Sequence, residues 1–185
     1  MSRISYKLVI SRGLPYLINT LFDAVFTILG IVIGSAFGSV VETRAIVGTI
    51  ITASISLGTS SGFSVYEAET IQEEKRIDKI EEALLTNLEN TLIAEDSRMV
   101  TILSSMLVFL TPLFACLITL IPFSLVYLDL LSVDKSILLA VIVDLSLIFL
   151  SGLVFGGDRR LLKGIRMTVL GGLIFLFGFI LNYWI

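Results

Sequence analysis

Long apolar runs recur along the whole chain and constrain its fold more than any other feature. A run of about 20 apolar residues is the length that an α-helix needs to cross the hydrocarbon core of a bilayer. Hydrophobic residues make up 56% of the 185 residues, charged residues only 16%, and the mean hydropathy is +0.98. The sequence therefore predicts an all-α integral membrane protein. The first run contains Asp23 and is too long for a signal-peptide core, so we expect it to be retained.

Charged or Gly/Pro-containing breaks divide the apolar sequence into five predicted transmembrane helices. They cover approximately 14–41, 45–66, 99–128, 136–156 and 161–185. Pro112 and Pro122 lie in the third helix, which we expect to be kinked or to end early. The predicted organisation is an N-terminal segment with two spans (1–66), a short acidic helical insert (67–98) and three further spans (99–185).

The distribution of Lys and Arg predicts how the chain is oriented. Eleven of the 13 basic residues lie in the N-terminal segment, in the insert, or around the start of the last span. All three places fall on one side of a five-span arrangement, and basic residues are enriched on the cytoplasmic side of membrane proteins. We therefore expect the N-terminus and the acidic insert to be cytosolic, in the cell membrane if the source is a prokaryote.

Two carboxylates fall inside the predicted spans, where an ionisable group is costly and is a functional candidate. Asp23 lies seven residues before Gly30, and Gly34 and Gly38 follow at intervals of four, so all four lie near one helix face. Because small residues let a neighbouring helix approach closely, we expect Asp23 to face the packed interior and not lipid. Asp144 in the fourth span is the second carboxylate, either functional or held in a structural pair or in protonated form by burial.

The second span carries a similar stripe of small residues. Ser54, Gly58, Ser61 and Gly62 lead toward Glu69 in the insert. Two such helices can pair around a polar pathway, and the simpler interpretation is that the glycines only promote close helix packing.

The residue types exclude several kinds of chemistry. The chain has no His, so His-based acid/base catalysis, His metal sites and Ser-His triads are absent, and we expect neither an enzyme nor a nucleic-acid-binding protein. The single Cys116 cannot form an internal disulfide. Oxygen ligands without His suit hard or borderline divalent cations such as Mn²⁺, Fe²⁺, Mg²⁺ or Ca²⁺.

The arrangement resembles the vacuolar iron transporter family of divalent metal transporters. The stretch DAVFTILGIVIGSAFG is similar to the family's first span, with Asp23 at the family's aspartate, Gly34 at the expected distance and Ala24 in place of the usual glycine. The second-span stretch SLGTSSGFSVYEAE, the third-span IPF and the final GDRRLLKGIRMTVLGG also look like the family. In two places the chain departs from it, because Ser61 aligns with the family's second-span glutamate and Glu69 falls near its metal-binding methionine.

The resemblance implies a homodimer that moves Fe²⁺ or Mn²⁺ out of the cytosol, with metal as substrate, no other cofactor, and protons exchanged in return. The resemblance implies an inner metal site of Asp23 with Glu69, and Ser61 and Glu67 are further candidates for it. The predicted transport pathway comprises Asp23, Ser61 and Glu69 together with the intramembrane carboxylate Asp144. In the insert, which holds 10 of the 16 acidic residues, Glu67, Glu74, Asp78 and Glu81 recur at helical spacing as one candidate ligand face. The alternatives are a solvated hairpin whose charges only aid solubility, or a non-transporting membrane scaffold whose acidic hairpin binds a protein partner.

Overall fold

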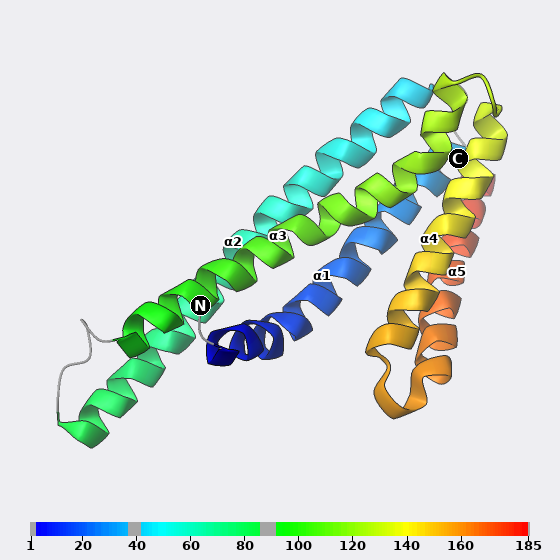
Figure 1. Ribbon diagram of the computed structural model, residues 1–185. Coiled ribbons are helices and arrows are strands. Elements are labelled where there is room, and N and C mark those ends of the chain that lie inside the picture. Colours follow the sequence, from blue (N-terminus) through cyan, green and yellow to red (C-terminus); the bar gives the residue numbers. More distant parts are fainter. Residues whose placement is uncertain (1–2, 37–41, 86–91, 185) are drawn as a thin grey trace. The chain divides into compact units, whose positions relative to one another are not determined.

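The computed structural model describes residues 3–36, 42–85 and 92–184, and these residues are almost entirely helical. The elements are α1 (Arg3–Ala36), α2 (Thr43–Leu84), α3 (Leu92–Tyr127), α4 (Val133–Phe155), the 3₁₀ turn η1 (Gly157–Arg159) and α5 (Arg160–Trp184). Figure 1 shows these helices and the short turns between α3 and α4 and between α4 and α5. The all-α fold class is confirmed.

Five segments of these helices are long and apolar enough to cross a membrane. They are Gly13–Ala36, Thr43–Ala83, Arg98–Tyr127, Val133–Phe155 and Gly157–Gly178. Large apolar side chains on them are exposed, among them Phe114, Leu117, Leu138 and Val154, each more than 60% accessible. Apolar surface on this scale is compatible with an integral membrane protein, because contact with lipid removes it from water. The prediction of five helices that could span a membrane is confirmed by their length and composition.

The described part of the acidic insert forms no helix of its own, because α2 continues without a break as far as Leu84 and residues 92–98 belong to α3. The 42 residues of α2 correspond to a helix about 63 Å long, roughly twice the ~30 Å thickness of the hydrocarbon core. The sequence explains this continuity, since residues 67–84 contain no Pro or Gly and are mostly good helix formers. The acidic half of α2 therefore extends beyond any single membrane crossing.

The two prolines of α3 do not end the helix, which runs through both of them to Tyr127. Of the two alternatives expected for the third span, a kink or an early end, the early end is therefore wrong. A proline removes one backbone hydrogen bond from a helix interior. Directly before Pro112, the Thr111 hydroxyl donates to the carbonyl oxygen of Leu107 at 2.9 Å.

The chain divides into two compact units, of which the first comprises Met1–Thr20 and Leu57–Thr111. Here α2 packs closely on α3 through glycines: a Cβ built on Gly58 would lie 2.6 Å from the Phe109 carbonyl oxygen, and one on Gly62 would lie 2.9 Å from the Phe109 Cβ. In the same unit, Gln72 Nε2 of α2 donates to the Tyr16 hydroxyl of α1 at 3.5 Å. This hydrogen bond joins the acidic half of α2 to the first half of α1.

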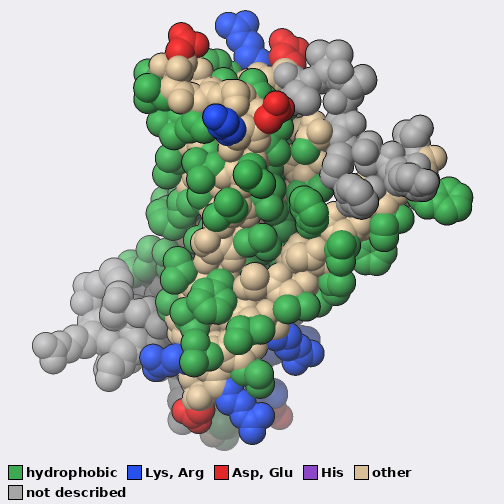
Figure 2. Space-filling view, turned by 90° about the vertical axis from the view of Figure 1, so that its right-hand side faces the viewer, with side chains coloured by type: hydrophobic (Ala, Val, Ile, Leu, Met, Phe, Trp, Pro, Cys, Tyr) green, Lys and Arg blue, Asp and Glu red, His purple; other side chains and the backbone are tan. Residues whose placement is uncertain are grey.

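The second unit comprises Leu21–Ser56 and Pro112–Ile185, and its best-defined part is the α4–α5 hairpin. The two backbones touch where Gly152 faces Gly164, because a Cβ built on Gly152 would lie 2.6 Å from the Gly164 Cα. Gly157 has a φ of +60°, a conformation that glycine adopts without strain, and it reverses the chain between the helices. On the face shown in Figure 2, hydrophobic side chains cover the middle and charged side chains gather at the two ends.

Candidate functional site

The most deeply buried carboxylate of the described residues is Asp144, in the middle of α4. Its side chain is completely buried within the second unit. The Thr119 hydroxyl of α3 donates to its Oδ1 at 2.5 Å, and Oδ2 has no hydrogen-bond partner among the described residues. One oxygen is therefore held by α3, and the other is free to bind a further group.

The local sequence explains why α3 and α4 meet at this point. On α3, Ala115, Thr119 and Phe123 recur every four residues and are all fully buried. On α4, Ala140, Asp144 and Ile148 form an equivalent buried row. The alanine of each row lies one turn before the polar residue, and its small side chain leaves room for close helix approach.

A second pair of polar side chains lies one turn from Thr119. The Cys116 thiol is hydrogen-bonded to the Ser54 hydroxyl of α2, which itself donates to the Ile50 carbonyl oxygen at 2.8 Å. Both residues are buried in the second unit. Thr119 also lies 3.2 Å from the Ala115 carbonyl oxygen, so its hydroxyl has an alternative acceptor if Asp144 turns away.

This arrangement suits reversible binding of a cation or a proton. An unpaired charge is costly in an apolar interior, and a carboxylate meets that cost by taking up a proton or a positive ion. A single threonine donor stabilises one oxygen, and the second has no partner in the part of the chain that the structure describes. Asp144 was predicted as a pathway residue, whereas Thr119 was not predicted, although its position in a buried row of α3 could have identified it.

Asp23 lies on the exposed side of α1. The opposite face of α1, formed by residues such as Val25, Ile28, Leu29 and Val32, is buried. The expectation that Asp23 faces the packed interior is therefore wrong within a single chain. The physical reason is that burial follows the larger branched side chains, which remove more apolar surface than the glycine face does.

The glycines of the first two spans differ in what surrounds them. A Cβ built on Gly30 or Gly34 would meet nothing within 4 Å, whereas Gly58 and Gly62 lie against α3. Gly38 lies outside the described residues. Of these glycines, Gly58 and Gly62 are therefore sites of close helix packing, whereas Gly30 and Gly34 belong to an open face of α1.

The predicted pathway and ligand residues of α2 separate into buried and exposed positions. Glu69 is buried, Ser61 and Glu81 are half-buried, and Glu67, Glu74 and Asp78 are exposed. Glu73, one turn after Glu69, is buried and lies 3.5 Å from the Arg76 guanidinium. Sequence reasoning missed Glu73, although its spacing from Val65 and Glu69 would have placed it on the same buried face.

The predicted ligand face on α2 does not form a metal site in the structure. Within residues 3–36, 42–85 and 92–184, no three His, Cys, Asp or Glu side chains are grouped so that they could hold a metal ion. Asp23 belongs to the second unit and Glu69 to the first. The inner site implied by the family resemblance draws one residue from each unit, and it stays a prediction.

Comparisons with protein-family models, with curated proteins and with solved structures give no match for this chain.

Proposed function

We propose that this protein is a membrane transporter that moves a divalent cation, Fe²⁺ or Mn²⁺, out of the cytosol in exchange for protons. The observation that carries the proposal is Asp144, a fully buried carboxylate in a candidate spanning helix, with one oxygen held by Thr119 and the other without a partner among the described residues. Intramembrane carboxylates of this kind mark ion pathways and proton relays. The choice of metal comes from the family resemblance and from the oxygen-rich composition.

In the proposed cycle, Asp144 alternately binds a proton and contributes to cation binding. Protonation removes the negative charge while the bundle is closed, and release of the proton gives a carboxylate that attracts the cation. Thr119 positions Oδ1, so that Oδ2 is the oxygen that exchanges its ligand. One carboxylate cannot complete a divalent site, so the remaining ligands come from other carboxylates or from water.

The proposal includes a homodimer in which the open face of α1 meets a second copy. Asp23, Thr27 and Gly34 are exposed on this face, and Gly30 is half-buried. Small residues at this spacing allow a neighbouring helix to approach closely, which supports this face of α1 as the dimer interface. In such a dimer the two Asp23 side chains would line the pathway from both subunits.

The proposal places the acidic half of α2 in the cytosol, with the N-terminus. The bias of Lys and Arg toward one side of the spans supports this orientation. The exposed carboxylates Glu67, Glu74 and Asp78 would then raise the local concentration of divalent cations on the cytosolic side of the membrane.

The test is uptake of Mn²⁺ into proteoliposomes under an imposed proton gradient. We expect uptake that depends on the gradient and that Asp144→Asn abolishes. The control is Asp134→Asn, because Asp134 is an exposed carboxylate in the first turn of the same helix. Equal uptake by the native protein and Asp144→Asn would remove Asp144 from the mechanism.

A scaffold function is the second candidate, and the exposed acidic surface of α2 favours it. The exposed carboxylates Glu67, Glu74 and Asp78 recur at helical spacing on a helix that extends well beyond one membrane crossing. Such a row of negative charges suits the docking of a basic protein partner. Calorimetry with Mn²⁺ and Fe²⁺ separates the two candidates. Micromolar binding supports transport, whereas no binding together with no uptake supports the scaffold.

A further inference from the structure

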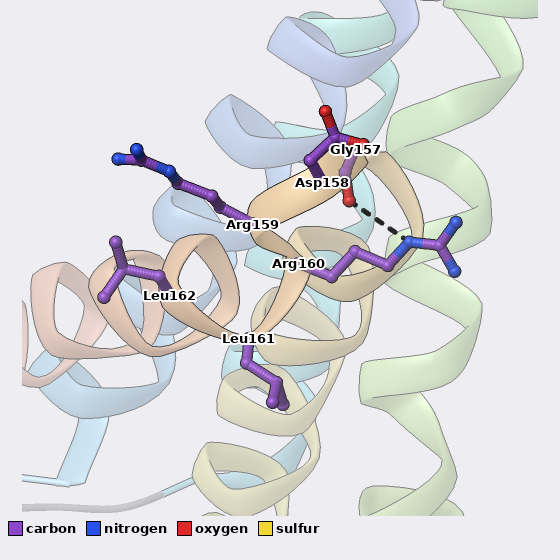
Figure 3. Close-up of a pocket in the computed structure, with 6 residues that line it drawn as sticks. All are labelled: Gly157, Asp158, Arg159, Arg160, Leu161 and Leu162. Atoms are coloured by element: carbon purple, nitrogen blue, oxygen red, sulfur yellow. Dashed lines mark hydrogen bonds between the residues drawn. The ribbon is translucent and has the colours of Figure 1, made fainter.

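Three cations share one face at the start of α5. Arg159 ends η1, and Lys163 and Arg166 follow at intervals of four and three residues, which places the three on one side of the helix. All three side chains are exposed. Figure 3 shows the turn that begins this face, with Arg159 and Arg160 extending to opposite sides of it.

These cations are not neutralised within the part of the chain that the structure describes. None of the three forms an ion pair with a described carboxylate. Arg160 differs from them, because it points away and its Nε donates to the Gly157 carbonyl oxygen at 3.2 Å. The face formed by Arg159, Lys163 and Arg166 therefore presents three positive charges to an external anion.

The same face becomes apolar further along α5. Leu170, Leu173 and Phe177 continue the spacing of four and three residues, and their side chains are 43%, 43% and 65% exposed. From Arg166 to Phe177 the helix rises about 16 Å, close to half of the ~30 Å hydrocarbon thickness. The face thus consists of a cluster of basic residues followed by an apolar strip whose length is close to the thickness of one leaflet. A phospholipid has the same arrangement, with a charged headgroup followed by acyl chains.

We propose that this face of α5 binds an anionic phospholipid. Its phosphate would lie against Arg159, Lys163 and Arg166, and one acyl chain would lie along Leu170, Leu173 and Phe177. Charge complementarity selects an anionic headgroup, since clusters of Lys and Arg next to a membrane span attract acidic lipids. The apolar strip selects a lipid over a free phosphate, because a soluble anion would leave it uncovered.

The α4–α5 hairpin gives this face a fixed position. The contact between Gly152 and Gly164 joins the two helices directly at the first turn of α5, between Lys163 and Ile165. A site on a rigid helix pair loses little entropy when the lipid binds. The inference does not depend on the proposed transport function.

The test uses the purified full-length protein in a neutral detergent, with bound lipid counted by native mass spectrometry. The probes are dioleoyl phosphatidylglycerol, dioleoyl phosphatidylcholine with the same chains, and glycerol phosphate as the headgroup alone. We expect phosphatidylglycerol to bind at least about tenfold more tightly than phosphatidylcholine. Glycerol phosphate at the same concentration should not displace it.

The triple variant Arg159→Gln/Lys163→Gln/Arg166→Gln should lose this preference. The matched control Arg44→Gln/Lys135→Gln/Arg160→Gln removes the same charge from other positions and should keep it. A conservative variant, Arg159→Lys/Arg166→Lys, should also keep it, which separates loss of charge from loss of folding. Equal binding of the two lipids by the native protein, displacement by glycerol phosphate, or equal loss in the matched control would each overturn the proposal.

Discussion

The glycine contact between α4 and α5 yields a quantitative prediction, tested by Gly152→Ala. A Cβ at Gly152 would lie 2.6 Å from the Gly164 Cα and 2.9 Å from its backbone nitrogen. Non-bonded carbon atoms prefer about 3.5–4.0 Å, so the helices must separate by about 1 Å. Overpacking of this kind costs about 1–3 kcal/mol, and a backbone contact cannot relax by rotating a side chain, so we expect the upper half of that range.

The matched control is Gly172→Ala, on the same hairpin. A Cβ at Gly172 would meet nothing within 4 Å. Both substitutions gain about 1 kcal/mol of helix propensity, so the difference between the two variants isolates the cost of overpacking. The measurement is the free energy of unfolding in mixed micelles titrated with a denaturing detergent. If Gly152→Ala were as stable as Gly172→Ala, the close α4–α5 crossing would be incorrect.

Two further predictions concern the candidate pathway. Thr119→Val should lower proton-coupled Mn²⁺ uptake about tenfold, the effect of losing a hydrogen bond worth about 1.4 kcal/mol, while Thr119→Ser keeps the hydroxyl and should stay within about twofold. If Thr119→Val took up Mn²⁺ as fast as the native protein, Thr119 would not position Asp144. Because Glu69 is buried and Glu67 exposed, Glu69→Ala should lower the free energy of unfolding by about 1–3 kcal/mol and Glu67→Ala should change it by less than about 0.5 kcal/mol. Equal effects on unfolding would contradict the burial of Glu69.

Sequence reasoning predicts the helices well because the membrane leaves few alternatives. A run of about 20 apolar residues has to satisfy its own backbone hydrogen bonds, and a helix does so within the run itself. The continuation of α2 follows from local propensity as well. The early end expected for α3 was wrong because other interactions of a long helix compensate for the hydrogen bond that a proline removes.

The site was harder to predict because it depends on how the helices are rotated about their axes. The spacing of Asp23 and the glycines identifies a face of α1 but does not say whether that face packs within the chain or remains open. The structure buries the opposite face, with Ile28 and Leu29 at its centre. The contact between Thr119 and Asp144 joins residues 25 positions apart on different helices, and no local pattern specifies such a pair.

The most direct test of the account is whether Asp144 exchanges a proton for a cation. Infrared difference spectroscopy of the reconstituted protein, at constant pH with and without Mn²⁺, monitors the C=O stretch of protonated carboxyl groups. The account predicts that Mn²⁺ removes such a band from the native protein and that Asp144→Asn lacks the change. A native protein whose carboxyl bands do not respond to Mn²⁺, or a variant that responds as the native protein does, would contradict it.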